Sequence, residues 1–268
     1  MRLASGTHGR WSILIYCFCR KENEMGSSGL SRKGYKYKRI LLKLSGEAVR
    51  GKDSIIDFDL LDAICKKLVA ISSDGIETAV IFGAGNIWRG RSGGSMDRVT
   101  ADRMGMLATV INCLAAKDAV IRAGGRAAVF TSTPMMPYAE YYSTDRAREA
   151  LSRGDVVFFA GGSGCPFFST DTAGILRAAE IGADVFLLAK NIDGIYDKDP
   201  GRYPDAKRFD RISYKEMAAL GLRAIDLTAS SFGSDFGPDA FAFRLGDPED
   251  IERALRGECA GTVITFRE

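Results

Sequence analysis

Residues 156–189 read VVFFAGGSGCPFFSTDTAGILRAAEIGADVFLLA. Two apolar runs predict strands at Val156–Ala160 and Val185–Ala189, and the segment between them predicts a helix over Asp171–Ile181 after a glycine-rich loop. A strand, a helix and a second strand in this order are typical of an α/β fold.

The same alternation continues on both sides of this stretch. Further strands are predicted at Arg39–Leu44, Thr78–Phe82, Ala127–Thr131, Phe241–Leu245 and Thr262–Phe266. Further helices are predicted at Asp59–Ser72, Val99–Ala123, Tyr214–Leu220 and Pro248–Leu255. We therefore predict an α/β fold with its helices covering one sheet, formed by a single domain of two lobes over residues 36–268.

The predicted helix at Val99–Ala123 has a regular apolar pattern. Its apolar residues recur at intervals of three and four, which predicts one buried face. The residues of that face are Met104, Leu107, Ala108, Ile111, Leu114 and Ala115.

Composition excludes several classes of function. The net charge of +3 is too small and too evenly spread to indicate nucleic acid as a partner. The six cysteines form no Cys-x-x-Cys pair, so neither a zinc site nor a disulfide framework is indicated, and a reducing cytoplasm fits best. The single histidine, His8, lies in a peripheral stretch, which argues against Ser-His-Asp and Cys-His mechanisms.

Residues 1–35 are expected to be a disordered or mis-annotated leader, with Met25 as an alternative true start. The apolar run Trp11–Cys19 is too short to span a bilayer, and no small-residue cleavage site follows it. We therefore expect no membrane partner.

Two glycine-bearing loops follow predicted strands, where open α/β sheets place their ligands. In Leu42–Glu47, Gly46 lets the backbone approach an anion and Lys43 adds a cation, although a lysine that ends a strand is more often only solvated. In the loop of residues 83–90, backbone N–H groups and Arg89 could bind phosphate. An ordinary strand-to-helix turn explains this second loop equally well.

The third loop, residues 161–171, is the most informative. Ser169, Thr170 and Asp171 are capping residues at the start of a predicted helix, whose free N–H groups and positive dipole end favour an anion. Phe167 and Phe168 cannot both point inward, so one is free to flank a planar base. Cys165 has no base to activate it and is interpreted as a contact residue.

Several anions brought to one place need compensating charge. Two unit negative charges 4 Å apart repel by about 4 kcal/mol at an effective dielectric constant near 20. Phosphoryl transfer requires mainly positioning and charge compensation, without a nucleophile from the protein. Lys43, Arg89 and the backbone amides of the loops are therefore the candidates for compensating this charge, together with a Mg²⁺ ion.

Together these loops resemble the bacterial-type UMP kinases of the amino acid kinase family, over about residues 36–266. The motifs that carry the resemblance are KLSGEA at 43–48, GAGNIWRG at 83–90, MDRVTADRMGML at 96–107, SGCPFFSTD at 163–171, and DGIYDKDP at 193–200 followed by PDAK at 204–207. The resemblance implies a three-layer αβα sandwich with a mainly parallel central sheet.

It also implies the transfer of a phosphoryl group from ATP to UMP in pyrimidine nucleotide biosynthesis. The residues implied for ATP are Lys43, Leu44, Ser45, Gly46, Gly85, Arg89, Lys190, Asn191, Tyr196 and Asp199, the last four on the adenine and ribose side. Those implied for UMP are Ala84, Asp102, Ser163, Gly164, Cys165, Pro166, Phe167, Phe168, Ser169 and Thr170. The catalytic residues implied are Lys43, Arg89 and Asp171, of which Asp171 would orient the lysine or the metal-bound phosphates. Mg²⁺ would be carried by the ATP phosphates without a metal site of the protein. A cytoplasmic homohexamer, activated by GTP and inhibited by UTP, is the form implied by the family.

Some positions depart from the family pattern. Ala84 replaces a glycine and Cys165 an asparagine, while residues 47–57 lack a Gly-Phe-Gly segment. Two alternatives stay open: a family member that phosphorylates a carboxylate, such as acetylglutamate or aspartate, and a non-catalytic relative that only binds a nucleotide or an oxyanion.

Overall fold

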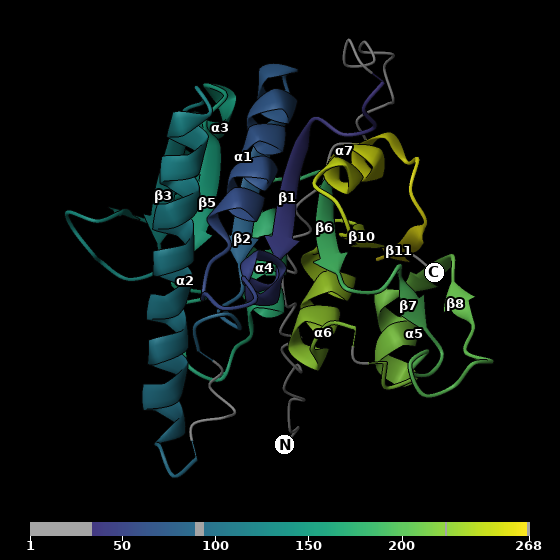
Figure 1. Ribbon diagram of the computed structural model, residues 1–268. Coiled ribbons are helices and arrows are strands. Elements are labelled where there is room, and N and C mark those ends of the chain that lie inside the picture. Colours follow the sequence, from purple (N-terminus) through teal and green to yellow (C-terminus); the bar gives the residue numbers. More distant parts are fainter. Residues whose placement is uncertain (1–33, 89–93, 223, 267–268) are drawn as a thin grey trace, which may run out of the picture.

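The protein is built on one mixed sheet of nine strands. The computed structural model describes residues 34–88, 94–222 and 224–266, and orders the strands β4-β3-β5-β2-β1-β6-β10-β11-β9 (Figure 1). The strands of this sheet are β1 (Arg39–Leu44), β2 (Glu77–Phe82), β3 (Ala127–Thr131), β4 (Glu140–Tyr141), β5 (Val156–Ala160), β6 (Val185–Lys190), β9 (Arg211–Ser213), β10 (Ala240–Arg244) and β11 (Gly261–Thr265). Only the pairing of β10 with β11 is antiparallel within it. Strands β7 (Ile195–Tyr196) and β8 (Arg208–Phe209) form a separate antiparallel pair.

Helices cover both faces of the sheet, which confirms the three-layer prediction. They are α1 (Phe58–Ser73), α2 (Arg98–Arg122), α3 (Thr144–Ser152), α4 (Thr170–Ile181), α5 (Tyr214–Ala219), α6 (Leu227–Phe236) and α7 (Glu249–Arg256), with a short 3₁₀ helix η1 (Gly46–Val49). One apolar core contains residues of α1, α2 and α7, and the other contains residues of α3, α4, α5 and α6.

Strand β1 lies in the middle of the sheet and sends alternate side chains into the two cores. Leu42 belongs to the core under α1 and α2, whereas Leu41 belongs to the core under α4. Since side chains alternate along a strand, Lys43 projects on the same face as Leu41. Lys43 is in register with Ile81 of β2 and Leu188 of β6.

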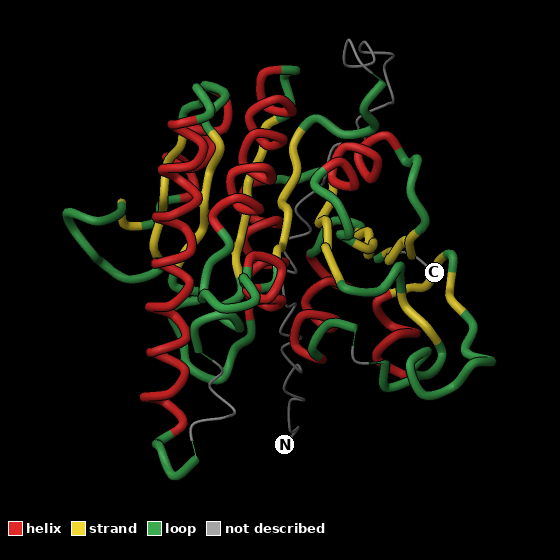
Figure 2. The backbone as a smooth tube through the Cα atoms, in the orientation of Figure 1, coloured by secondary structure: helices red, strands yellow, loops and turns green. Residues whose placement is uncertain are grey.

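The parallel strands end along one edge of the sheet. In Figure 1, β1, β5 and β6 all run downward, so the loops that follow them lie below the sheet. Figure 2 shows the N-terminal part of α2 projecting past this same edge. Loops distant in the sequence are thereby brought together, as open α/β sheets require of their ligand sites.

Every strand and helix predicted from the sequence is present, with ends shifted by two residues or fewer. The helices α3 and α6 and the short strands β4, β7, β8 and β9 were not predicted. Helix α6 has the sequence LTASSFGSDF, whose serines and glycine are weak helix formers. It forms because Asp226 caps its N-terminus and because it packs against α4 and α5.

The predicted buried face of α2 is partly wrong. Leu107 and Ile111 are 52% and 48% exposed, and smaller residues face the sheet instead. The buried residues are Ala101, Ala108, Thr109, Val110, Asn112, Cys113, Ala116, Ala119 and Val120. Small side chains let the helix approach the sheet closely, and two of the polar ones find specific partners there. By length and composition α2 could cross a membrane, but its packing against α1, β3 and β5 is that of a core helix.

Three expectations fall on residues at the N-terminus. The apolar run at 11–19, His8 and Met25 lie outside the described residues. Tyr35, which was assigned to the leader, is 4% exposed and donates a hydrogen bond to Asp74 at 3.0 Å.

Helix α4 lies against β6 at Gly174. A Cβ at this position would lie 2.6 Å from the Phe186 ring, which is too close for any side chain. We expect Gly174→Ala to lower the free energy of unfolding by about 1–3 kcal/mol, because the overpacked core must shift. This opposes the gain of about 1 kcal/mol that alanine brings to a helix interior.

Urea denaturation measures the change. Gly246→Ala is the matched control, since its new methyl group would be in ordinary contact, 3.6 Å from Asp250. A stabilised Gly174→Ala protein would contradict the close packing described for this helix.

Candidate functional site

The candidate site is built around an ion pair at the N-terminus of α4. Lys43 Nζ, near the end of β1, lies 3.1 Å from Asp171 Oδ1 in the first turn of α4. The two side chains are only 12% and 17% exposed, so each charge depends on the other for compensation. Ser169 accepts hydrogen bonds from the backbone N–H groups of Asp171 and Thr172, which confirms the predicted cap. The remaining N–H groups and the helix dipole favour an anion here.

The glycine-bearing loops after β1 and β2 pack together through their backbones. A Cβ at Gly46 would lie 2.5 Å from the backbone nitrogen of Gly85, so only glycine fits. The Asn86 side chain is buried and exchanges two hydrogen bonds of 2.9 Å with Asn112 of α2. Asn112 also donates to the Gly83 carbonyl at 3.0 Å. This buried amide pair therefore holds the second loop against α2.

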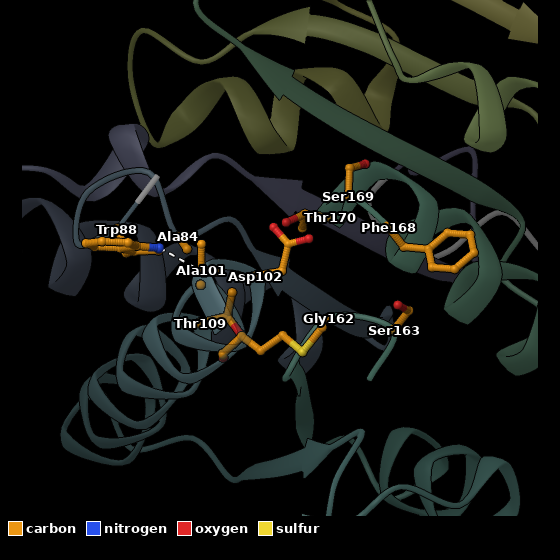
Figure 3. A pocket seen from close by; sticks show the side chains of 12 residues that line it. Ala84, Trp88, Ala101, Asp102, Thr109, Gly162, Ser163, Phe168, Ser169 and Thr170 are labelled. Carbon is orange, nitrogen blue, oxygen red and sulfur yellow. Dashed lines mark hydrogen bonds between the residues drawn. The ribbon is translucent and has the colours of Figure 1, made fainter. Parts of the chain in front are cut away.

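A first pocket of about 220 Å³ opens beside the N-terminus of α4 (Figure 3). It is lined by the loop after β2, the first half of α2 and the loop before α4. The lining residues are Ala84, Trp88, Ala101, Asp102, Gly105, Met106, Thr109, Gly162, Ser163, Phe168, Ser169 and Thr170. In Figure 3, Trp88 and Phe168 lie at opposite ends, with the Asp102 carboxylate between them. Aromatic walls with a few placed polar groups suit a ligand that has a planar ring and hydroxyl groups.

Helix α2 is tied to the loop before α4 at two points. The Asp102 carboxylate accepts hydrogen bonds from Arg98 at 2.8 and 2.9 Å and from the backbone N–H of Phe167 at 2.8 Å. The Thr109 hydroxyl accepts one from the backbone N–H of Gly161 at 2.9 Å. Phe167 has a φ of 72°, in the left-handed region that non-glycine residues rarely occupy. The Asp102 contact therefore helps to hold the loop in a strained conformation.

A second pocket, of about 560 Å³, also reaches Ser169, so both pockets meet at the N-terminus of α4. Its lining residues are Ser169, Asp171, Ala218, Gly221, Leu222, Ile225, Asp226, Leu227 and Ser230. The apolar side chains come from the segment between α5 and α6, and the carboxylates come from Asp171 and Asp226. Asp171 lines this second pocket, so the Lys43–Asp171 pair lies beside the helix turn that the two pockets share.

Asp226 connects α4 to α6. Its carboxylate caps α6 by accepting a hydrogen bond from the backbone N–H of Ala229 at 2.9 Å. It also accepts hydrogen bonds from the hydroxyls of Thr172, at 2.9 Å, and Ser169. One carboxylate therefore orients the helix turn that carries Asp171.

Six of the residues assigned to UMP line the first pocket. They are Ala84, Asp102, Ser163, Phe168, Ser169 and Thr170. Gly164, Cys165, Pro166 and Phe167 are not among its lining residues, and Cys165 is exposed. Phe167 and Phe168 are 67% and 49% exposed, and of these two side chains only that of Phe168 lines the pocket.

The residues assigned to ATP lie in two groups. Around the ion pair, Leu44 is fully buried and Ser45 caps η1 by accepting a hydrogen bond from Ala48 at 3.1 Å. Lys190, at the end of β6, is half-buried. Arg89 lies outside the described residues.

The second group is formed by the segment after β6, and its members do not line the second pocket. Asn191 is exposed. Tyr196 donates a hydrogen bond to Asp193 at 2.7 Å, and Asp199 accepts one from the backbone N–H of Gly201 at 2.9 Å.

Sequence reasoning missed Asp226 and half of the first pocket. Trp88, Ala101, Gly105, Met106, Thr109 and Gly162 line that pocket but were not assigned to it. Four of these residues lie on α2 at helical spacing around Asp102, so plotting the helix faces around Asp102 could have found them. They are Ala101, Gly105, Met106 and Thr109. Asp226 carries the signal of a helix cap, an acidic residue directly before a helix, but α6 itself was not predicted.

The residues present fit a divalent cation that arrives with a phosphate ligand. Within residues 34–88, 94–222 and 224–266, no three His, Cys, Asp or Glu side chains form a metal-binding group. Asp171 Oδ1 is buried and, apart from the Lys43 ion pair, has no hydrogen-bond partner in the described structure. Magnesium is commonly held by one or two carboxylates together with substrate phosphates, and Asp171 could provide such a carboxylate.

Comparison with known proteins found one family model and several solved structures to which the chain is similar. The model of the amino acid kinase family matches residues 38–235. The chain is similar to the UMP kinase of Ureaplasma parvum, with 31% identity and a TM-score of 0.81 over 85% of this chain and 98% of the other. It is similar to the UMP kinase of Bacillus anthracis, with 33% identity and a TM-score of 0.82 over 87% and 97%. Uridylate kinase from Archaeoglobus fulgidus shares the fold, with 24% identity and a TM-score of 0.63 over 84% and 99%.

The contacts of Asp226 give a testable difference between two helix caps. Loss of an aspartate cap costs about 1 kcal/mol. We expect Asp226→Ala to lower the free energy of unfolding by about 1 kcal/mol beyond the loss of the cap alone. The additional loss arises because the hydroxyls of Ser169 and Thr172 also lose their acceptor.

Urea denaturation compares this variant with Asp57→Ala. Asp57 caps α1 through one backbone N–H, that of Leu60 at 3.0 Å, and has no described role in the site. Equal losses in the two variants would mean that the link from α6 to α4 adds nothing to stability.

Proposed function

The chain belongs to the amino acid kinase family, and we propose that it acts as a UMP kinase, transferring the γ-phosphoryl group of ATP to UMP to give ADP and UDP. The observation that carries the proposal is the Lys43–Asp171 pair at the helix end where two pockets meet. Two ligands can bind there side by side, which phosphoryl transfer between nucleotides requires. The similarity to two UMP kinases over almost their whole lengths supports this choice of substrates.

We assign UMP to the first pocket. Ser169 and Thr170 bring the N-terminus of α4 to it, where backbone N–H groups can bind the acceptor phosphate. The Asp102 carboxylate can accept hydrogen bonds from ribose hydroxyls, and Phe168 offers an aromatic face to the pyrimidine.

We assign ATP to the second, larger pocket. The apolar side chains of Leu222, Ile225 and Leu227 suit the adenine ring. The ATP phosphates would extend toward Asp171 and Lys43. The backbones of Gly46 and Gly85 pack closely there, and their N–H groups would be near the phosphate oxygens.

In the reaction, a phosphate oxygen of UMP attacks the γ-phosphorus while the bond from that phosphorus to the bridging oxygen of ADP breaks. Lys43 compensates the negative charge of the transferred group, and Asp171 orients the lysine. Magnesium bound to the ATP phosphates would neutralise further charge, with Asp171 as its carboxylate neighbour. Arg89 is proposed to bind the same phosphates. No histidine, cysteine or serine nucleophile is needed.

We further propose a cytoplasmic homohexamer in pyrimidine nucleotide biosynthesis, with GTP and UTP as effectors. Leu107 and Ile111 support self-association, because they place two large apolar side chains on the exposed side of α2. Light scattering after size-exclusion chromatography measures the assembly, and a monomer at micromolar concentration would contradict it.

The reaction is tested by following ADP release from ATP with UMP, CMP, dCMP, acetylglutamate or aspartate as the acceptor, with and without GTP or UTP. We expect rapid turnover with UMP. Turnover only with a carboxylate would identify another member of the family. Binding of nucleotides without turnover of any acceptor would identify a non-catalytic relative.

Lys43 gives the sharpest test of the mechanism. We expect Lys43→Ala to lower kcat at least a hundredfold, about 3 kcal/mol of transition-state stabilisation, with the fold intact by circular dichroism. Lys66→Ala on the exposed side of α1 is the matched control and should keep its full rate. An unchanged rate in Lys43→Ala would remove this lysine from the mechanism.

A further inference from the structure

A second lysine lies beside the ion pair. Lys190 ends β6, the strand that neighbours β1, and Lys43 is in register with Leu188 two residues before it. The Lys190 ammonium donates a hydrogen bond to the Ala224 carbonyl. Ala224 adjoins Ile225 in the wall of the second pocket, and Asp171 lines the same pocket. The ammonium group therefore lies next to the chain segment that forms this wall, although Lys190 is not itself a lining residue of the pocket.

This ammonium group is under-satisfied. A lysine has three N–H donors, and the Ala224 carbonyl is the one acceptor that the described residues offer Lys190. Among the described residues, no carboxylate forms an ion pair with the Lys190 ammonium, and Asp171 is already paired with Lys43. Two donors and a full positive charge thus remain for a ligand.

Keeping a charge in this place costs stability. Burial lowers the pKa of Lys190 below its ordinary value, while Asp171 raises that pKa and Lys43 lowers it again. A half-buried cation without an anionic partner among the described residues is costly, because burial disfavours the charged form.

We propose that Lys190 binds a phosphate oxygen of ATP and acts as a second cation beside Lys43. The inference rests on the proposed function and makes it more specific, because the family resemblance implies the adenine and ribose side for this residue. Asp171 would then lie between two lysines, and the pair of lysines would bring two positive charges to the phosphates. Contact with Lys190 requires only its free donors, so the Ala224 hydrogen bond can persist.

The phosphate contact is tested by comparing two ligands in Lys190→Met, which removes the charge and keeps the apolar stem. By isothermal titration calorimetry we expect the affinity for MgADP to fall at least tenfold, while the affinity for adenosine stays within twofold. Lys66→Met, an exposed change on α1, should alter neither affinity. Lys190→Arg, which keeps a positive charge and N–H donors for phosphate, should lose less MgADP affinity than Lys190→Met.

Equal losses for MgADP and adenosine would overturn the proposal and place Lys190 on the base and sugar side. Loss of neither affinity would remove Lys190 from ATP binding. Thermal unfolding distinguishes a structural role of Lys190 from a role in phosphate binding. We expect Lys190→Met to unfold at the same temperature as the original protein or higher. A lower unfolding temperature with an unchanged ratio of the two affinities would show that the lysine only supports the fold.

Steady-state kinetics adds a second readout. We expect Lys190→Met to lower kcat with ATP at least tenfold and to leave the KM for UMP within twofold. If the unmodified protein binds MgADP but phosphorylates no acceptor, the proposed function fails, whereas the affinity ratio still tests the contact of Lys190 with phosphate.

Discussion

The ion pair between Lys43 and Asp171 is the interaction on which the arrangement of the site depends. It joins the central strand of the sheet to the first turn of α4, and both side chains are largely withdrawn from water. A pair buried in this way requires precise support, since either charge alone would be costly. That support comes from the core beneath α4, where Gly174 allows the helix to approach Phe186 closely.

The same pair explains why two pockets share one helix end. The N-terminus of α4 offers N–H groups to both pockets, and its position is held from two sides. Asp226 binds Ser169 and Thr172 from the α6 side, while Asp102 and Thr109 hold the preceding loop from the α2 side. Rigid elements thus position a site whose chemistry is mainly charge compensation.

Sequence reasoning found the loops that surround the site better than the helix faces that complete it. The cap at Ser169 and the pocket-lining Asp102 are where the motifs imply them. The orientation of α2 was misjudged, because its large apolar residues Leu107 and Ile111 face outward while Asn112 is buried against Asn86. Hydrophobic periodicity cannot identify a buried polar residue that is satisfied by a distant loop.

The sequence by itself determined the α/β class, the order of the longer strands and of most of the helices along the chain, and the loops that carry Lys43 and Asp171. These properties are local, because they depend on apolar runs, glycines and capping residues close together in the chain. Only the tertiary structure decided that Lys43 and Asp171 touch, that Asp226 links two helices, and that Lys190 reaches the Ala224 carbonyl. Such contacts join residues tens of positions apart, and their geometry follows from how the sheet and helices pack.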